Sequence, residues 1–381
     1  MMKILPSLDG ELKQLVGTRV PGVAVVIVGA EGIRARASIG LADLASGMPM
    51  ATNVAVPWFS MTKLVTATTV MSLAARGVLP LDAPLLPLVP VMSGLRPVAW
   101  AQRITARHLL QHSGGLANPI PLRWVHPAAS PGPDPAAFLR TRLAKHPKLR
   151  SAPGARASYS NLGPLLLAAA ITHVTGDSFE DVVRREVLQP TGMTHTDFCY
   201  PAAVPMATGN HPRYNPMRLV LPRWVVGNPH GRWLTLRPFL VDGAAYGGLV
   251  GTADDAARFL QLHLAGGRID DQQVIAAADA ATMCHINQPG KRYDLGLGWF
   301  TPARDREAQP AFVEHLGGGA GFFNLLRMYP SVGIGIVLLG HATRSHIAAP
   351  PPLAPHHHPT PPPPPPPPRP PPPPTPPAPP P

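Results

Sequence analysis

Apolar segments rich in β-branched residues lie at both ends of this chain. Val23–Gly29 and Ile33–Gly40 have the composition of paired strands, and further strand-like runs at 312–314, 322–329 and 333–339 lie between glycine or proline turns. Helical patterns occupy the chain between these groups, at 62–75, 162–174, 179–188 and 254–264. This arrangement predicts an antiparallel sheet that the chain leaves and rejoins. We therefore expect an α/β (α+β) fold, with an antiparallel sheet flanked by helices and a mainly helical inserted subdomain.

Composition divides the chain into a globular part and a tail. Residues 1–349 are expected to form one domain, with an α/β body at about 1–77 and 236–349 and the helical insertion at about 78–235. In the tail, 350–381, 23 of 32 residues are proline, which cannot continue a helix, so this segment is expected to be disordered. Proline-rich segments bind SH3-like or profilin-like domains, but no other feature of the chain favours such a partner.

The chain is basic, with 33 Lys+Arg against 21 Asp+Glu and a formal net charge of +12. The basic residues are scattered rather than arranged in a stripe interleaved with aromatic residues, so no nucleic-acid partner is expected. No run of 18 apolar residues occurs, so no membrane span is expected. The first residues lack the apolar core and cleavage site of a signal peptide, which predicts a cytoplasmic protein as written. A true start further upstream would instead allow a periplasmic or secreted one.

The sequence predicts neither a cofactor nor a metal. The two cysteines, Cys199 and Cys284, have no CxxC partner. The His356–His358 run lies in the proline-rich tail without further ligands at a fixed spacing, so it is interpreted as low complexity rather than a metal site.

Ser60 and Lys63 stand at the start of the 62–75 helix, in the order Ser-Met-Thr-Lys. Residues three apart share a face of a helix, so the Lys63 amine can lie beside the Ser60 hydroxyl. A serine hydroxyl is a poor nucleophile until a base takes its proton, and a lysine can do so when burial lowers its pKa. Alone the pattern is weak, because S-x-x-K arises by chance about once in a chain of this size. An ordinary serine and a solvated lysine are then the favoured interpretation.

Two further segments carry groups suited to acyl transfer. Tyr159 and Asn161 directly precede the 162–174 helix; a tyrosine near a lysine can relay protons, and an amide can hold a carbonyl or the lysine. Taken alone, a packed tyrosine and a capping asparagine are the favoured interpretation. The run from His315 to Gly319 begins at the end of a strand, and its glycines can bring backbone N–H groups close to an oxyanion. A glycine-rich hairpin is the plain alternative.

Together the three segments resemble the motifs of the serine β-lactamase and penicillin-binding-protein superfamily. In chain order these motifs are S-x-x-K, a Tyr or Ser motif ending in Asn, and K-T-G. The Tyr-x-Asn form is similar to that of class C β-lactamases and the related esterases. The resemblance covers about residues 9 to 340 and extends to GLADL at 40–44, ITARHLLQHSGGL at 104–116, LQPTGM at 188–193, YGGLVGTADDAARFL at 246–260 and YDLGLGW at 293–299.

The resemblance implies a serine hydrolase that works through an acyl-enzyme. Ser60 would be the nucleophile, Lys63 its activating partner and Tyr159 the general base or proton relay; which residue takes the first proton stays open. Asn161 would hold both Lys63 and the substrate. The backbone N–H groups of Ser60 and Gly318 would form the oxyanion hole. The substrate-binding residues that the resemblance implies are Asn161, His315, Gly317 and Gly318.

The third motif departs from the family pattern, because His315-Leu316-Gly317 replaces Lys-Thr-Gly. A β-lactam carries a carboxylate that a fixed cation and a hydroxyl would bind, whereas Leu316 offers no hydrogen bond and His315 is only partly charged near neutrality. This departure favours a small neutral ester or amide substrate over a β-lactam. A β-lactamase or D-alanyl-D-alanine carboxypeptidase is the alternative enzyme. A non-catalytic penicillin-binding sensor or scaffold is the alternative of another class, and the joint presence of Ser60, Lys63 and Tyr159 argues against a wholly inactive site.

Several other features are expected to be structural. His112 should hold a turn through backbone hydrogen bonds, and Asp254-Asp255 should supply negative charge at a helix N-terminus. Relatives continue from the last strand into a covering helix, but here the chain after Gly340 soon becomes proline-rich. We therefore expect part of the apolar 333–339 strand to be uncovered, unless a short helix at Asp9–Val16 packs there.

Overall fold

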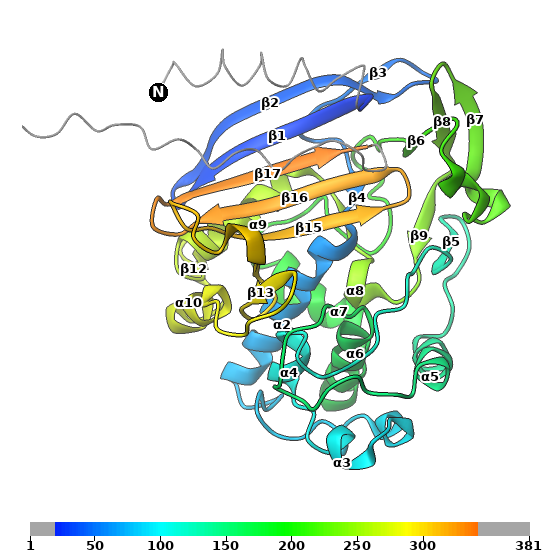
Figure 1. Ribbon diagram of the computed structural model, residues 1–381. Helices are drawn as coiled ribbons and strands as arrows, with labels where there is room; N and C mark the ends of the chain where they lie inside the picture. The colour runs from blue at the N-terminus through cyan, green and yellow to red at the C-terminus, as the bar shows by residue number, and fades with distance from the viewer. Residues whose placement is uncertain (1–19, 342–381) are drawn as a thin grey trace, which may run out of the picture.

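A computed structural model describes residues 20–341 (Figure 1). The Asp9–Val16 helix, the proline-rich tail and the His356–His358 run lie outside the described residues. An eight-stranded sheet draws its strands from both ends of the described chain, in the order β13-β14-β15-β16-β17-β1-β2-β3. Each neighbouring pair is antiparallel, as expected. The strands are β1 (Gly22–Gly29), β2 (Gly32–Asp43), β3 (Met48–Pro49), β13 (Tyr293–Leu295), β14 (Phe300–Pro302), β15 (Val313–Gly319), β16 (Phe322–Tyr329) and β17 (Ile334–Gly340).

The centre of the sheet is formed by β1 and β17, whose side chains alternate between two apolar clusters. Val337 and Leu339 of β17 face the main core and are fully buried. Ile336 and Leu338 face the opposite cluster, where Trp233 also packs, and they are only 7% and 4% exposed. The strand is therefore buried on both faces, as its continuous apolar run predicts. The expectation that part of it is uncovered is wrong at these residues.

Helices pack beneath the sheet, and α2 carries Lys63 (Figure 1). Their bounds are α2 (Thr62–Ala75), α3 (Val98–Ala101), α4 (Ala106–Leu110), α5 (Pro135–Lys145), α6 (Leu162–Thr175), α7 (Phe179–Val183), α8 (Ala244–Gly247), α9 (Ala253–Leu264) and α10 (Ala277–Cys284). The 62–75 helix is found as predicted, and the 162–174 helix is one residue longer. The helix predicted at 179–188 ends at Val183 and continues as a π-helical turn over Arg184–Leu188.

The acidic pair at the start of α9 does more than complement the helix dipole. Asp254 accepts hydrogen bonds from Arg36 and Thr52, which join α9 to the sheet side of the molecule. Asp255 accepts from the backbone N–H of His195 and the hydroxyl of Thr196. The pair is structural, as expected, and it also ties distant loops together.

Short strands that the sequence analysis did not predict lie in and beside the helical insertion. They form three small antiparallel sheets, made of β4 (Val56–Pro57) with β10 (Val250–Gly251), β5 (Val125–Pro127) with β9 (Phe239–Val241), and β6 (Asn210–Pro212), β8 (Trp233–Leu236) and β7 (Val226–His230). A fourth pair, β11 (Arg268–Ile269) and β12 (Gln272–Gln273), follows α9. Within residues 20–341, no helix is long and apolar enough to cross a membrane.

Candidate active site

Ser60 lies in a single 3-10 turn, Phe59–Met61, that leads directly into α2. Phe59 has a φ of +50°, which is rare for a residue with a bulky side chain and tends to occur at functional sites. The Trp58 N–H that precedes this turn donates to the carbonyl of Leu249, at 2.7 Å. The turn is thus fixed by its surroundings, and it leaves the Ser60 side chain partly exposed at the edge of a cavity.

Lys63 lies one turn further along and is 3% exposed. Its Nζ lies 3.0 Å from Ser60 Oγ, 3.0 Å from Asn161 Oδ1 and 2.8 Å from the carbonyl oxygen of Tyr246. Burial holds the pKa of Lys63 well below its usual value, because the low-dielectric interior disfavours the ammonium. Nζ is the donor to Ser60 Oγ as well as to the two carbonyl oxygens. Loss of one proton would leave two N–H bonds for the carbonyl oxygens and turn the amine lone pair toward the Ser60 hydroxyl.

Tyr159 stands beside this pair. Lys63 Nζ lies 5.0 Å from the centre of the Tyr159 ring, and the Ser60 side chain is a hydrogen-bonding neighbour of its hydroxyl. Burial raises the pKa of Tyr159 above its usual value of 10.0. The phenol therefore keeps its proton at neutral pH, which suits it to donate or relay a proton rather than to act as a standing phenolate base.

The segment that carries Tyr159 and Asn161 is held from behind by His112. The His112 ring packs against the Tyr159 ring at a centroid distance of 4.4 Å, and its Nδ1 accepts the backbone N–H of Ser160 at 3.2 Å. The His112 carbonyl accepts the N–H of Ser158 at 2.8 Å. His112 is structural, as predicted, but it also orients the candidate proton donor. Asn161 lies just before α6 and donates its backbone N–H to Asn118 Oδ1.

His315 lies on β15, on the opposite side of the site, and is 1% exposed. Burial, together with the charge of Lys63 when that amine is protonated, lowers the pKa of His315 to about 3, so the imidazole is neutral at physiological pH. This corrects the expectation that His315 is partly charged. Its Nδ1 lies 2.9 Å from the carbonyl of Leu316, which only a donor can bond, while Nε2 is buried without a hydrogen-bond partner. The ring presents an acceptor and no cation to the site.

The glycine run is part of β15 rather than a loop or hairpin after it. β15 pairs with β16 in unbroken register, from Val313 opposite Met328 to Gly319 opposite Phe322. A Cβ on Gly317 would lie 2.1 Å from the carbonyl of Trp58, and one on Gly319 would lie 2.0 Å from the Phe59 ring. These glycines let the strand lie directly against the turn that carries Ser60.

Gly318, the predicted oxyanion donor, differs from its neighbours. A Cβ there would meet only the Phe323 ring, at 3.9 Å, so no steric contact requires a glycine. β14 pairs with β15 only at Phe300 and Glu314, so the outer edge of β15 from His315 to Gly319 has no partner strand among the described residues. Of this edge, His315 and Leu316 line the cavity beside Ser60, whereas Gly317 and Gly318 do not, and the role of the Gly318 N–H stays a prediction.

A cavity of about 400 Å³ joins these parts, and it is lined by Ser60, Asn118, Ala157, Ser158, Tyr159, Lys291, Arg292, Tyr293, Leu295, Phe300, His315 and Leu316. Sequence reasoning missed several residues that contribute to the site. Tyr246 acts through its backbone carbonyl, which no motif reveals, although it begins the YGGLVGT segment. Asn118 and the pair Lys291-Arg292 lie in loops that the sequence analysis did not single out.

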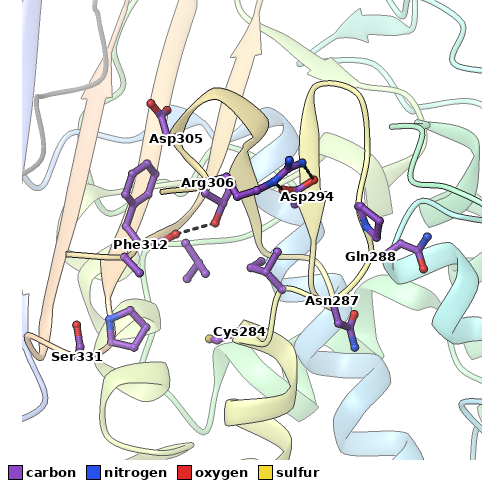
Figure 2. Close-up of a pocket in the computed structure, with 14 residues that line it drawn as sticks. Cys284, Asn287, Gln288, Asp294, Asp305, Arg306, Phe312 and Ser331 are labelled. Atoms are coloured by element: carbon purple, nitrogen blue, oxygen red, sulfur yellow. Dashed lines mark hydrogen bonds and ion pairs between the residues drawn. The ribbon is translucent and has the colours of Figure 1, made fainter. Parts of the chain in front are cut away.

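Two other cavities lack a comparable set of reactive groups. One of about 530 Å³ lies behind the loop that leads into β13 (Figure 2). Its only thiol is that of Cys284, whose pKa burial raises to about 12, so it remains protonated. Another, of about 1070 Å³, lies among α5, α6 and α7 and contains none of the predicted site residues. Among residues 20–341, no three His, Cys, Asp or Glu side chains gather as metal ligands.

Comparison with known proteins identifies the family of this chain. The Beta-lactamase family model matches residues 8–350. The chain belongs to this family. It is 30% identical to Esterase EstB of Burkholderia gladioli over 77% of this chain and 78% of that protein. It is 27% identical to D-alanyl-D-alanine-carboxypeptidase/endopeptidase AmpH of Escherichia coli (strain K12), over 75% of this chain and 70% of that protein.

Solved structures support the fold. D-amino acid amidase from Ochrobactrum anthropi SV3 superimposes with a TM-score of 0.72 at 21% identity, covering 89% of this chain and 92% of that one. The octameric penicillin-binding protein homologue from Pyrococcus abyssi gives a TM-score of 0.71 at 21% identity, covering 89% and 74%. The predicted fold and superfamily are confirmed, and the chain is a serine hydrolase of this superfamily.

Proposed function

We propose that this chain hydrolyses small esters or amides through an acyl-enzyme on Ser60, with neutral Lys63 as the first base. The observation that carries this proposal is the hydrogen bonding of Lys63. Two carbonyl oxygens, of Asn161 and Tyr246, can accept only N–H bonds, so once Lys63 has lost a proton its lone pair is left for the Ser60 hydroxyl 3.0 Å away. A buried amine with a lowered pKa and this orientation is a competent general base.

In the acylation step, Ser60 Oγ attacks the substrate carbonyl while Lys63 takes the hydroxyl proton. The backbone N–H groups of Ser60 and Gly318 are assigned to the oxyanion that forms. Tyr159 gives its proton to the leaving oxygen or nitrogen as the bond to the carbonyl carbon breaks, and Lys63 returns a proton to the phenol. Deacylation reverses these transfers with water in place of the leaving group, so protons balance over the cycle.

The substrate class follows from the sheet side of the site. Leu316 and neutral His315 offer neither the hydroxyl nor the cation that would hold a β-lactam carboxylate beside β15. Among the relatives, EstB is named an esterase and AmpH a carboxypeptidase/endopeptidase. The missing hydroxyl favours ester or amide turnover over β-lactam turnover, by about 1–3 kcal/mol for one unmade hydrogen bond.

The test combines active-site labelling with a substrate comparison. Intact-mass analysis after treatment with a fluorophosphonate should show one adduct on the wild-type chain and none on Ser60→Ala, which should retain the wild-type circular dichroism spectrum. The value of kcat/KM should be higher for p-nitrophenyl butyrate than for nitrocefin. Undiminished labelling of Ser60→Ala would overturn the nucleophile. A preference for nitrocefin would favour a β-lactamase, and stable acylation without turnover would favour a penicillin-binding sensor.

A further inference from the structure

Two cations, Lys291 and Arg292, line the cavity beside Ser60, and no carboxylate lines it. Both side chains are exposed, and neither forms an ion pair within the part of the chain that the structure describes. Arg306, by contrast, is paired with Asp294. The cavity thus carries two positive charges that no acidic side chain balances.

The loop that bears these cations is fixed rather than loosely attached. Gln288 and Leu295 exchange backbone hydrogen bonds of 3.0 and 2.8 Å, which closes the loop at its base. The N–H of Gly290 donates to Asp294 at 3.0 Å, and Arg306 donates twice to the same carboxylate, at 2.6 and 2.9 Å. Figure 2 shows Arg306 reaching Asp294.

The same loop is also joined to the segment that precedes Tyr159. Ala157 donates its backbone N–H to the carbonyl of Pro289 at 3.0 Å, and the Gln288 side chain donates to the carbonyl of Gly154 at 3.2 Å. The backbone that carries the two cations is therefore set relative to Tyr159. A charge held in place costs less ordering on binding than a charge on a mobile loop.

A row of rings leads from the proton donor to these cations. Tyr159 lies 6.3 Å from Tyr293 and 6.0 Å from His315, and Phe300 lies 4.5 Å from Tyr293 and 4.9 Å from His315, measured between ring centres. Lys291 and Arg292 immediately precede Tyr293. A leaving group that receives its proton from Tyr159 would therefore lie along this wall and point toward the two cations.

We infer that Lys291 and Arg292 are specificity-determining residues that select esters or amides whose leaving group carries a carboxylate or another anionic group. This inference rests on the proposed function, because it assigns the leaving group to the Tyr159 side of the site. The family pattern places a lysine on the strand equivalent to β15, where this chain has uncharged His315. Here the positive charge comes from the loop before β13.

The experiment compares two aryl esters that differ only in the charge of the leaving group. For the wild-type chain, kcat/KM for 3-carboxyphenyl butyrate should exceed that for 3-carbamoylphenyl butyrate by about five- to tenfold, the effect of one or two exposed ion pairs. In Lys291→Gln/Arg292→Gln this ratio should fall to about one, because kcat/KM falls more for the carboxy ester than for the carbamoyl ester. Raising the salt concentration to about 0.5 M should reduce the wild-type ratio, because exposed charges are screened.

The matched control removes two exposed cations that do not line the cavity, in Lys148→Gln/Arg223→Gln, which changes the net charge equally. This control should keep the wild-type ratio. The inference is overturned by a wild-type ratio of one, by a ratio that survives in Lys291→Gln/Arg292→Gln, or by a ratio that disappears in the control. In each of these cases, Ser60-dependent hydrolysis of both esters still upholds the proposed function. Absence of hydrolysis, or hydrolysis that persists in Ser60→Ala, overturns the proposed function and the inference with it.

Discussion

The two walls of the site differ in how completely their polar groups are satisfied. The helical wall consists of Ser60, Lys63, Tyr159 and Asn161. There, each hydrogen-bonding direction of the Lys63 amine has a partner, and Asn161 is itself held by Asn118. The sheet wall consists of His315 and Leu316 of β15. Among the described residues, His315 Nε2 is buried without a hydrogen-bond partner, and the Leu316 side chain has no hydrogen-bonding group. The helical wall retains the family motifs, whereas the sheet wall departs from them.

This difference separates chemistry from recognition. A general base must keep its geometry and pKa for any substrate, so its hydrogen bonds are completed within the protein. A recognition surface leaves groups unsatisfied until a substrate arrives, and it can change without loss of the reaction. We therefore expect substitutions on the helical wall to affect all substrates alike, and substitutions on the sheet wall to change their ranking.

The largest effect is expected from Lys63→Arg. A guanidinium stays protonated and cannot accept the Ser60 proton, so kcat/KM should fall at least about 10³-fold for every substrate. In the wild-type chain, kcat/KM should rise with pH as Lys63 loses its proton, at a pH below the usual lysine value of 10.5. Stopped-flow or steady-state assays across pH 5–10 measure both. A variant that keeps a tenth of the wild-type kcat/KM would show that Lys63 is not the base.

A smaller loss is expected from Asn161→Asp, which is almost isosteric. A carboxylate 3.0 Å from Lys63 Nζ favours the ammonium and raises the pKa of Lys63, so less free base is present at neutral pH. The value of kcat/KM at pH 7 should fall about 10- to 100-fold and should recover partly as the pH rises. Asn161→Ala is the control, because it removes the acceptor without adding charge. If both variants lose activity equally at all pH values, Asn161 does not act through the Lys63 pKa.

On the sheet wall, Leu316→Thr should change the ranking of substrates. The added hydroxyl can donate to a β-lactam carboxylate, so kcat/KM for nitrocefin should rise by about tenfold, equivalent to one hydrogen bond. The value for p-nitrophenyl butyrate should change by less than about threefold. Leu316→Val has the same shape as the threonine without its hydroxyl and should show no gain. A gain of equal size in both variants would assign the effect to space rather than to hydrogen bonding.

The helical wall was the easier part to predict from the sequence. Ser60 and Lys63 are three residues apart on one helix, so local geometry alone brings them together. The prediction that Tyr159 and Asn161 lie beside them depended on the family resemblance, because these contacts join residues about a hundred positions apart in the sequence. The long apolar runs that form β1, β16 and β17 were equally accessible, since a buried central strand is marked by composition.

The parts that sequence reasoning missed depend on tertiary contacts. Tyr246 contributes a backbone carbonyl, which any residue type could supply. The neutral state of His315 follows from burial beside Lys63, and composition does not reveal burial. The glycine run was placed at the end of a strand, but it continues β15, and Gly317 and Gly319 are needed for close approach to the Ser60 turn. Each of these features is fixed by a neighbour distant in sequence.

The smallest effect concerns acid stability, which His315 should influence without taking part in proton transfer. Its folded-state pKa of about 3 lies below the ordinary value of 6.5, so the unfolded chain binds a proton more readily. The stability it contributes is present above pH 6.5 and is lost as the pH falls toward 3. His315→Gln cannot titrate and should remove about 3 kcal/mol of the fall in unfolding free energy between pH 6.5 and 4. Urea unfolding at the two pH values measures this difference.

His263, buried on α9 with a pKa also lowered to about 3, provides the matched control. His263→Gln should reduce the acid sensitivity of unfolding by a similar amount while leaving substrate ranking unchanged, whereas His315→Gln should also alter KM. An inflection in the kcat/KM profile between pH 5 and 8 that disappears only in His315→Gln would instead make the sheet wall part of the chemistry, and the division between the two walls would fail.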